Sequence, residues 1–465
     1  MRPHRALILA GLLSTSFLVA APVAAQNASG DQALMTRIEK LEAEVQALKA
    51  ELRKSQAEAT EAKTKAEAAT AKADEAVAKV EKASNGVSPT TSALGGGLFN
   101  YRAGDVRFHL GGYAGGNVEF VDNGENSTFA DVNFNPIFLV QYKDWLLFES
   151  ELEFETTDGE GTKLELEYAS LDLMLNDYAT LVFGKYLSPI GLFQERLHPK
   201  WINKAISRPV GFDGTVEPLT DVGLQLRGGI PVGENMKLTY VFMIGNGPQV
   251  EEEGQPALEG FGEDNNDNKA IGGRISFFPV PWLELGGSAY HARVSGLDEL
   301  SGEADADETG LGVHVEAVPA ALEPTNADLD IFGAHAVATY KDLDLRFEYL
   351  HSKRDAFISV ADPGGLPEAL PTQKTEAWYA QAAYKLAGVT NQEFVKDLEL
   401  VARFSQLNVK QGILFVDDAQ DRLTFGVNYL LAPNIVIKVN YERRDFDEPD
   451  LKTENRFMGQ FAIGF

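Results

Sequence analysis

The chain contains no cysteine among its 465 residues. This absence excludes disulfides, metal sites built on thiolates, catalytic cysteines and lipid attachment through a cysteine. Basic residues are also scarce, because 41 lysines and arginines stand against 69 aspartates and glutamates, which leaves a formal net charge of -28. Binding to nucleic acid requires lysine and arginine clustered along a phosphate backbone, so we expect no nucleic-acid partner.

Long hydrophobic runs are missing after the first 25 residues, since none approaches the roughly 18 apolar residues that a membrane-spanning helix needs. The single apolar run, residues 6–21, follows the basic residues Arg2 and Arg5 and precedes small residues that end at Ala25. This order is typical of a secretory signal peptide, which we assign to residues 1–25. A membrane location therefore depends on strands, which lipid accepts only as closed barrels.

Motifs of catalysis and of cofactor binding are missing as well. The chain has no P-loop, no Gly-x-Ser-x-Gly and no His-Glu-x-x-His, and its seven histidines are scattered. The acidic run 264–267 offers oxygen ligands but lacks the spacing of an EF-hand, and we interpret it as a solvated loop. A serine and a histidine brought together on the surface remain the only route to a hydrolase. We expect no enzyme, no cofactor and no metal site.

The sequence does contain apolar and polar residues that alternate with a period of two. At its C-terminal end Phe457, Phe461, Ile463 and Phe465 share one side of an extended chain, and polar or small residues occupy the other side. A strand with this pattern can face lipid on one side and water on the other.

The alternation predicts sixteen strands after the first hundred residues, and they are separated by turn signals. The strands are 105–121, 129–142, 145–157, 162–176, 178–186, 220–230, 236–247, 269–279, 281–295, 328–341, 342–354, 374–387, 397–410, 420–432, 434–446 and 455–465. Short connections alternate with long polar ones at 187–219, 248–268, 296–327 and 355–373, as in barrels with short periplasmic turns and long outer loops. A further alternating stretch at 309–317 would make the count odd, and we assign it to a long loop.

We therefore predict an all-β fold, a 16-stranded antiparallel transmembrane β-barrel over residues 105–465. A barrel of this size has a lumen too wide for side chains to fill, so its interior holds water unless a segment plugs it. Channel function follows from that width.

Residues 34–83 keep an unbroken heptad register ahead of the barrel. Its a positions are Ile38, Val45, Leu52, Ala59, Ala66, Ala73 and Val80, and its d positions are Leu34, Leu41, Leu48, Ser55, Ala62, Ala69, Ala76 and Ala83. This pattern predicts an N-terminal α-helical coiled coil about 75 Å long within a periplasmic segment 26–84, joined to the barrel by a Gly/Ser/Pro linker at 85–104. Opposite charges at neighbouring g and e positions favour a parallel homo-oligomer, but the heptads leave two or three strands open.

The long connection 187–219 is basic in an acidic protein. Between positions 196 and 208 every charged residue is basic, namely Arg196, His198, Lys200, Lys204 and Arg208. If the loop folds into the lumen, these cations lower the energy of an anion in a narrow passage. Alternatively, they pair with acidic residues of the wall and merely hold the loop in place. Both roles are compatible.

Basic residues of the predicted wall complete the candidate substrate path. They are Lys185, Arg227, Arg274, Arg346 and Arg403. The four arginines lie opposite the apolar set of their strands and therefore face the lumen, whereas Lys185 has the phase of the outward set and lies at a strand end. In another strand Glu149, Glu151, Glu153 and Glu155 also face inward, where they pair with the arginines or make the pore weakly cation-selective.

The stretch from Leu181 to Glu195, LVFGKYLSPIGLFQE, resembles a strand-and-loop segment of the phosphate-selective porin O and P family. The resemblance extends more loosely from about Gly111 to Phe465, and it implies a sixteen-stranded trimeric channel in a Gram-negative outer membrane. A stalk of heptads before such a barrel is similar to the dicarboxylate channels of the DcaP type, which implies carboxylated aromatic or aliphatic anions as solutes.

We therefore expect an outer-membrane porin for passive diffusion of small anionic solutes, either phosphate or carboxylates. Its expected partners are outer-membrane lipid, lipopolysaccharide and further copies of the same chain, with a trimer implied by the resemblance. The other hypothesis is a structural anchor or tether, whose stalk reaches from the barrel toward the peptidoglycan.

Overall fold

The computed structural model describes residues 99–122, 127–157, 161–250, 255–259, 267–295, 325–359, 368–390 and 392–465, together with Gln46 and Lys49. The predicted signal peptide, nearly all of the coiled coil, most of the linker and the stretch 309–317 lie outside these residues. The chain divides into two compact units, Met1–Val87 and Ser88–Phe465, and the second unit holds the barrel.

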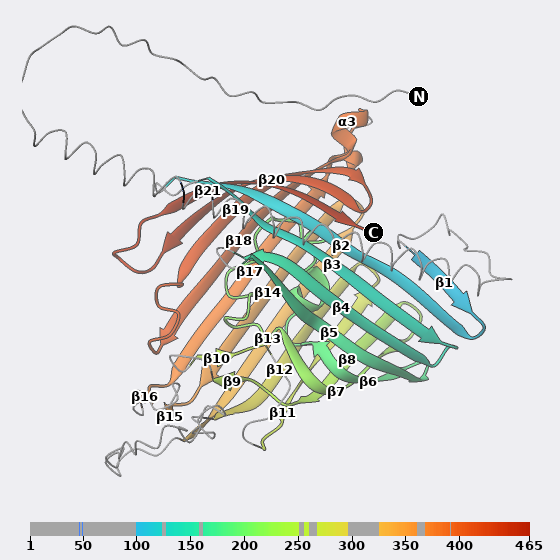
Figure 1. Ribbon diagram of the computed structural model, residues 1–465, viewed down its shortest axis with the longest axis horizontal. Coiled ribbons are helices and arrows are strands. Elements are labelled where there is room, and N and C mark those ends of the chain that lie inside the picture. Colours follow the sequence, from blue (N-terminus) through green and yellow to red (C-terminus); the bar gives the residue numbers. More distant parts are fainter. Residues whose placement is uncertain are drawn as a thin grey trace, which may run out of the picture. The chain divides into compact units, whose positions relative to one another are not determined.

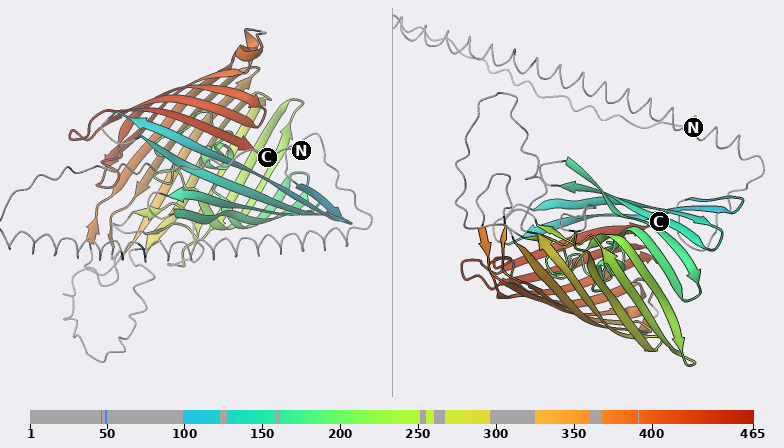
Figure 2. Two further views of the ribbon diagram at one scale, coloured as in Figure 1. Left: turned by 45° about the horizontal axis from the view of Figure 1, so that its top comes forward. Right: turned by 90° about the horizontal axis from the view of Figure 1, so that it is seen from below.

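Sixteen antiparallel strands close into a barrel, as Figure 1 and the two further views of Figure 2 show. The strands are β2 (Val106–Val121), β3 (Thr128–Tyr142), β4 (Leu146–Thr157), β5 (Gly161–Asn176), β6 (Ala179–Leu187), β7 (Thr220–Val232), β8 (Met236–Gly245), β11 (Ala270–Val280), β12 (Leu283–Ser295), β13 (Asn326–Tyr340), β14 (Leu343–Arg354), β17 (Gln373–Lys385), β18 (Leu398–Gln411), β19 (Gln420–Ala432), β20 (Ile435–Phe446) and β21 (Glu454–Gly464). Each pairs with the next along the chain, and β21 pairs back onto β2. The predicted barrel is confirmed.

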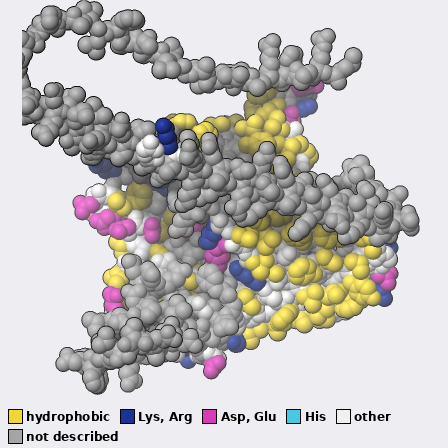
Figure 3. All heavy atoms as spheres, in the orientation of Figure 1, with side chains coloured by type: hydrophobic (Ala, Val, Ile, Leu, Met, Phe, Trp, Pro, Cys, Tyr) yellow, Lys and Arg dark blue, Asp and Glu magenta, His cyan; other side chains and the backbone are white. Residues whose placement is uncertain are grey.

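The period-two pattern of the sequence appears directly as an outer and an inner face. Along β19, Leu423, Phe425 and Val427 are exposed, whereas Thr424 and Asn428 on the alternate positions are buried inside the barrel. Figure 3 shows the resulting apolar outer surface. Lipid on the outside and water or packed loops on the inside account for this inversion of the usual burial pattern.

Aromatic side chains mark the end of the barrel where the short turns lie. Trp145 lies 5.9 Å from Tyr142 across one turn, and Trp282 lies 5.5 Å from Tyr340 near another, measured between ring centroids. Aromatic rings of this kind form the girdles that fix a barrel at the membrane interface. No helix within the described ranges is long and apolar enough to cross a membrane.

The seam where the barrel closes contains a strand that the alternation did not predict. Strand β1 (Phe99–Ala103) pairs with the first residues of β2, directly beyond the point where Phe465 and Gly112 exchange backbone hydrogen bonds of 3.0 and 2.8 Å. Tilted strands are staggered, so β2 extends past the C-terminus and exposes an edge, which β1 covers. The predicted linker 85–104 therefore needs a correction, because its last residues belong to the sheet.

Smaller elements lie in the connections. Two short hairpins, β9 (Gln249–Val250) with β10 (Pro256–Ala257) and β15 (Phe357–Ser359) with β16 (Glu368–Leu370), belong to long loops. The turn between β17 and β18 carries a 3-10 helix, η3 (Leu386–Gly388), and a short α-helix, α3 (Glu393–Lys396). Figure 1 shows α3 projecting beyond the strand ends.

Candidate constriction site

The connection between β6 and β7, residues 188–219, folds into the barrel and is here called the inner loop. Its apolar residues Ile190, Phe212 and Val216 are fully buried, although they lie in a loop. The short helix α2 (Phe193–Leu197) follows a turn at Gly191, whose φ of +83° favours glycine. The inner loop therefore behaves as a packed plug rather than as a solvated outer loop.

Aromatic contacts fix one side of the inner loop to the wall. The ring of Tyr379 on β17 lies 5.0 Å from that of Phe212 and 6.3 Å from that of Phe193, both in edge-to-face orientations. All three rings are buried, and their contact stabilises the loop against the wall.

Cations of the wall hold the backbone of the inner loop. Arg274 donates to the carbonyl oxygens of Pro189 (3.1 Å) and Gly191 (2.6 Å). Arg403 donates to the carbonyl oxygen of Ser207 (3.0 Å) and to its hydroxyl (2.7 Å). Both guanidinium groups are buried. The expected ladder of inward arginines is therefore corrected at these two positions, because their donors are occupied by the loop and do not face a passing solute.

Lys438 on β20 has the same role, which was not predicted. Its ammonium group is buried and donates to the carbonyl oxygens of Lys200 (2.5 Å) and Asn203 (2.6 Å). Its position in the alternation does predict an inward side chain, but its loop partners lie more than 230 residues away. Only the folded chain brings these groups together.

Three basic residues of the inner loop form ion pairs with carboxylates of the wall. Arg196 lies 2.7 Å from Glu284, Lys204 lies 2.7 Å from Glu399 and Lys200 lies 3.3 Å from Glu155, measured between nitrogen and oxygen. Lys200 also donates to the carbonyl oxygen of Asp131 at 2.7 Å. These contacts are those of a loop held in place by its cations, which was one of the two roles expected for them.

The other two basic residues of the inner loop make mainly local contacts. His198 Nδ1 lies 2.5 Å from the carbonyl oxygen of Gln194, and its Nε2 lies 3.7 Å from the Glu151 carboxylate. Burial lowers the pKa of His198, but the hydrogen bond and charge of Glu151 outweigh burial and raise this pKa overall. The Arg208 guanidinium lies 5.1 Å from the centre of the Phe193 ring and donates to the carbonyl oxygen of Phe212 at 2.8 Å.

Among the described residues, a larger and a smaller cavity lie beside the inner loop. The larger, about 430 Å³, lies between the loop and the wall of β4 to β7, and its lining includes Glu149, Arg196 and Arg227. The smaller, about 230 Å³, is lined by Arg196, Arg346 and Tyr379. The side chains of Arg196 and Arg227 are 38% and 35% exposed, compared with 18% for Lys200, 21% for Lys204 and 17% for Arg346. These two arginines therefore face the open space beside the inner loop.

The remaining wall candidates differ in where they point. Arg346 pairs with Asp344 through two hydrogen bonds of 2.6 and 3.0 Å and lines the smaller cavity. Lys185 has the sequence phase of Phe183, which is 60% exposed on the outside, but it follows Gly184, whose φ of +128° interrupts the alternation. The charge of Lys185 acts on the carboxylate of Glu259, in the loop that packs onto the inner loop, so its place in the substrate path stays a prediction.

The four glutamates of β4 that were expected to face inward are mostly compensated. Glu149 lies 3.4 Å from the guanidinium of Arg227, which also pairs with Asp172. Glu151 is buried and accepts hydrogen bonds from the Tyr113 hydroxyl (2.7 Å) and the Asn135 amide (3.0 Å). The acidic wall thus consists of Glu149 and Glu155, which pair with Arg227 and Lys200, and of Glu151, which is held mainly by neutral donors.

A chain of alternating charges that sequence reasoning missed crosses four neighbouring strands on the lumenal side. It consists of Arg422, Glu442, Arg444, Glu454, Arg456 and Glu119, in that order. Glu442 lies 2.8 Å from Arg444, and Arg456 lies 3.2 Å from Glu119. These charged residues occupy the polar positions of the alternating pattern in β19 to β21, so the sequence predicts that they face inward. Only the pairing of the strands shows that their charges alternate.

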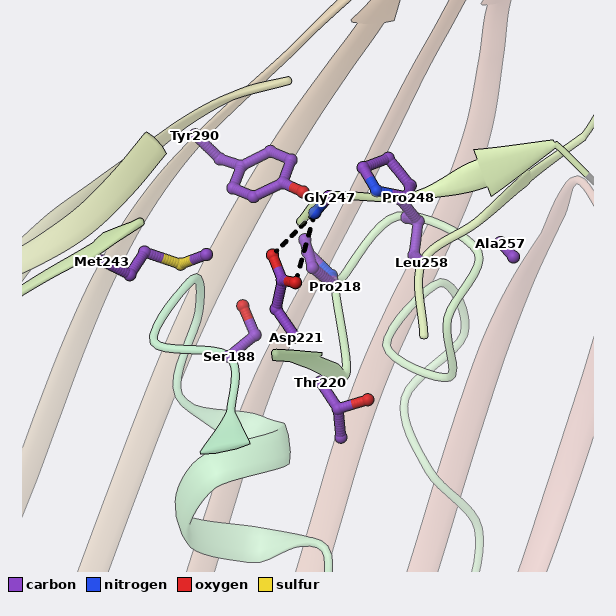
Figure 4. Close-up of a pocket in the computed structure, with 10 residues that line it drawn as sticks. All are labelled: Ser188, Pro218, Thr220, Asp221, Met243, Gly247, Pro248, Ala257, Leu258 and Tyr290. Atoms are coloured by element: carbon purple, nitrogen blue, oxygen red, sulfur yellow. Dashed lines mark hydrogen bonds between the residues drawn. The ribbon is translucent and has the colours of Figure 1, made fainter. Parts of the chain in front are cut away.

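A second loop packs onto the end of the inner loop. The amide of Leu219 donates to the carbonyl oxygen of Leu258 at 2.7 Å. Figure 4 shows the junction, where the buried Asp221 carboxylate accepts the backbone N–H of Gly247 at 3.2 and 3.3 Å, beneath Tyr290. The connection that carries β9 and β10 therefore packs onto the end of the inner loop, which was not predicted.

The geometry offers little support for catalysis. Ser276 Oγ lies 3.1 Å from His335 Nε2, but Glu284 approaches the same nitrogen at 3.5 Å, and the histidine is buried. A serine hydrolase needs the acid on the other ring nitrogen and an accessible serine. Within the described ranges, no group of three or more histidine, aspartate or glutamate residues is placed to hold a metal ion.

Comparison with known proteins gives one family and several solved barrels. Residues 262–456 match the model of the family described as phosphate-selective porin O and P. No curated protein matches the chain. The outer-membrane channel DcaP of Acinetobacter baumannii is similar, with 11% identity, a TM-score of 0.49, and coverage of 79% of this chain and 100% of that one.

Two further barrels give similar values. The anion-selective porin from Comamonas acidovorans has 12% identity and a TM-score of 0.48 over 77% of this chain and 100% of that one. OmpF of Salmonella typhi has 14% identity and a TM-score of 0.49 over 79% of this chain and 100% of that one. The motif around Gly184 lies outside the matched stretch, which covers the later strands. The family match over residues 262–456, together with the closed sixteen-stranded wall, confirms the resemblance to the phosphate-selective porins O and P and supports an outer-membrane channel.

Proposed function

We propose that the protein is a passive porin for small anionic solutes, phosphate or carboxylates, which pass beside the inner loop. The observation that carries this proposal is the exposure of Arg196 and Arg227, at 38% and 35%, in the cavities next to the loop. Guanidinium groups present planar pairs of donors that suit carboxylate and phosphate oxygens. No energy source or cofactor is required.

The acidic residues around these two arginines are less accessible than the arginines themselves. Glu284, the partner of Arg196, is 6% exposed, and Asp172, a partner of Arg227, is 2% exposed. Burial raises the pKa of Glu195, but Arg274 and Arg196 outweigh burial and lower this pKa overall, so the carboxylate stays ionised and paired. A solute in the larger cavity therefore meets positive charge first, although the protein as a whole is acidic.

The experiment is a reversal-potential measurement in a planar bilayer with a KCl gradient. Arg196→Gln and Arg227→Gln are compared with Arg443→Gln, which removes an exposed arginine from a strand surface where it pairs with Asp445. We expect the first two changes to lower the ratio of anion to cation permeability and the third to leave it unchanged. An unchanged ratio in all three variants would overturn the proposed role of the cavity arginines.

A weakly cation-selective porin is the second candidate, and the acidic wall favours it. Glu151 and Glu167 face the inner loop and accept hydrogen bonds from neutral donors, such as the Gln194 amide on Glu167 at 2.6 Å. The same bilayer measurement separates the candidates, because this one gives cation preference in the unmodified protein.

We also propose that the protein assembles as a homo-oligomer, with the trimer implied by the family resemblance. The heptads of residues 34–83 support association of parallel stalks. Native mass spectrometry of the full-length mature chain measures the number of copies directly. The tether hypothesis is tested with a chain that begins at residue 88 and therefore lacks the heptads. If the stalk is a tether, this chain still conducts but no longer sediments with peptidoglycan, whereas the full-length mature chain does.

A further inference from the structure

The larger cavity beside the inner loop has accessible charges of both signs. Its lining includes Arg196 and Arg227, and also the carboxylates of Glu149 and Glu195, whose side chains are 24% and 26% exposed. Another carboxylate of the lining, Glu151, is only 1% exposed. A molecule in this cavity can therefore reach two guanidinium groups and two carboxylates.

The two arginines keep donors that the wall does not use. Arg196 reaches Glu284 through Nη1, at 2.7 Å. Arg227 reaches both Asp172 and Glu149 through one nitrogen, Nη2. A guanidinium group has five N–H donors, so each arginine can still bind the carboxylate of a ligand.

The two accessible carboxylates are loosely paired with these arginines. Glu149 lies 3.4 Å from Arg227, and Glu195 lies 3.8 Å from Arg196, whereas a direct hydrogen bond between such charged groups measures about 2.7–2.9 Å. Glu195 also pairs with Arg274 through the same oxygen, Oε2, so Oε1 stays available to an ammonium group. Burial raises the pKa of Glu195, but the charges of three arginines, among them Arg196 and Arg227, lower it overall. The carboxylate is therefore ionised.

The cavity also has an apolar side. Ile137, Val182 and Leu187 contribute to it from the wall, and Ile202 contributes from the inner loop. The volume of about 430 Å³ lies within the range of pockets that bind small organic molecules, roughly 300–1,000 Å³. The cavity therefore has room for a small molecule with an apolar side chain beside its charged groups.

Neither a simple anion nor a simple cation satisfies all of these groups. An anion on the arginines lies close to two carboxylates that repel it, and a cation on the carboxylates lies close to two arginines. A solute with a carboxylate and an ammonium group on neighbouring atoms offers an opposite charge to both sets. Such a solute has no net charge, so the balanced charge of the cavity does not oppose its entry.

We propose that the larger cavity binds small zwitterions, namely amino acids with an apolar side chain. The carboxylate of the ligand binds the two cavity arginines, its ammonium group binds Glu149 and Glu195, and its side chain contacts the apolar side. This ligand class goes beyond the anions of the proposed function, and it rests on that function only in using the same two arginines.

The test is isothermal titration calorimetry of the full-length mature protein in detergent, which measures binding whether or not the pore conducts. The probes are leucine, isocaproate, which is leucine without its ammonium group, and isopentylamine, which is leucine without its carboxylate. We expect leucine to bind about tenfold more tightly than either of the other two. This is the effect of one further hydrogen bond between charged groups in a site open to solvent.

Two variants separate the roles of the charges. Glu149→Gln removes one acceptor of the ammonium group and leaves Arg227 paired with Asp172, so it should remove most of the advantage of leucine over isocaproate. Arg227→Gln should weaken the binding of both ligands. The matched control is Glu119→Gln, because Glu119 also pairs with a lumenal arginine, Arg456 at 3.2 Å, but does not line the cavity. This control should bind all three probes as the unmodified protein does, and heat-modifiable gel mobility verifies that every variant is folded.

Three results would overturn the proposal. The first is leucine binding no tighter than that of isocaproate, which would make the cavity a site for anions alone. The second is tighter binding of isopentylamine than of leucine. The third is an equal loss in Glu119→Gln and Glu149→Gln, which would assign the effect to the charge of the whole lumen. The proposed function is judged separately, because an unchanged permeability ratio in the arginine variants would refute that function while the expected order of the three affinities would still support the zwitterion site.

Discussion

Replacement of Gly191 by alanine tests whether the inner loop is held as a rigid constriction. Gly191 has a φ of +83°, and a methyl group added there would lie 2.7 Å from Glu348 Oε1 and 2.8 Å from Glu217 Oε1. These two oxygens accept the backbone N–H groups of Leu192 (2.5 Å) and Gln194 (3.0 Å) at the start of α2. The change therefore strains the turn and also displaces the two carboxylates that hold the helix.

The magnitude follows from these two effects. An alanine in the left-handed region costs about 1–2 kcal/mol. Leaving one buried backbone N–H without its acceptor adds about 1–3 kcal/mol, so the position of the loop loses about 2–5 kcal/mol. This is enough to populate displaced arrangements of the loop while the hydrogen-bonded wall of the barrel stays intact.

Gly214→Ala is the matched control, because Gly214 also lies in the inner loop with a φ of +98°, and an added methyl group would lie 3.4 Å from the nearest atom, Leu219 Cδ1. This variant has the strain but not the collision. In single-channel recordings we expect Gly191→Ala to show a larger and noisier current, and Gly214→Ala to resemble the unmodified protein. Identical currents in the two variants would refute the view that the carboxylates around Gly191 hold the constriction.

Three further predictions concern the anchors of the inner loop. Burial raises the pKa of Glu217, and the nearby charges of Glu348 and Asp213 raise it further, whereas the charge of Arg208 lowers it in part. The folded loop thus binds a proton that the released loop gives up. The anchor therefore weakens as the pH rises above the ordinary carboxyl pKa of about 4.3. Current noise should increase with pH in the unmodified protein but not in Glu217→Gln. Lys438→Met removes the donor to two loop carbonyls and should speed cleavage of the inner loop by an added protease, whereas Lys396→Met, an exposed lysine of α3, should not. Lys204→Gln leaves the buried Glu399 without its cation and should lower the free energy of unfolding in urea by about 2–4 kcal/mol. This loss is somewhat less than for a fully buried pair because Lys204 is partly exposed. The double variant Lys204→Gln/Glu399→Gln should recover most of it.

The strands were predictable because lipid and water impose a period of two on every residue of the wall. The predicted strand 145–157 and the observed Leu146–Thr157 differ by one residue, and similar agreement holds around the barrel. Strand β1 was not predicted because Phe99–Ala103 is short and follows a run of glycines, so it shows too few alternating residues to indicate a strand. Its existence depends on the open edge that barrel closure leaves on β2.

The site was predictable in its location but not in its pairing. Five basic residues in an acidic chain marked the inner loop, yet their partners lie far away in sequence, as Lys204 and Glu399 do. Nothing local distinguishes Arg403, whose donors hold the loop backbone, from Arg227, whose guanidinium faces a cavity. The difference arises from how the loop packs, and only the folded structure contains that information.

The central claim is that guanidinium groups left exposed beside the inner loop, and not the acidic average of the chain, determine which ions pass. The most direct measurement is the sign of the reversal potential of the unmodified protein in a planar bilayer under a KCl gradient, followed by addition of phosphate or succinate. We predict preference for chloride and a block of the current by the added anions. Preference for potassium, with no effect of either anion, would contradict the claim and assign selectivity to the glutamates of the wall.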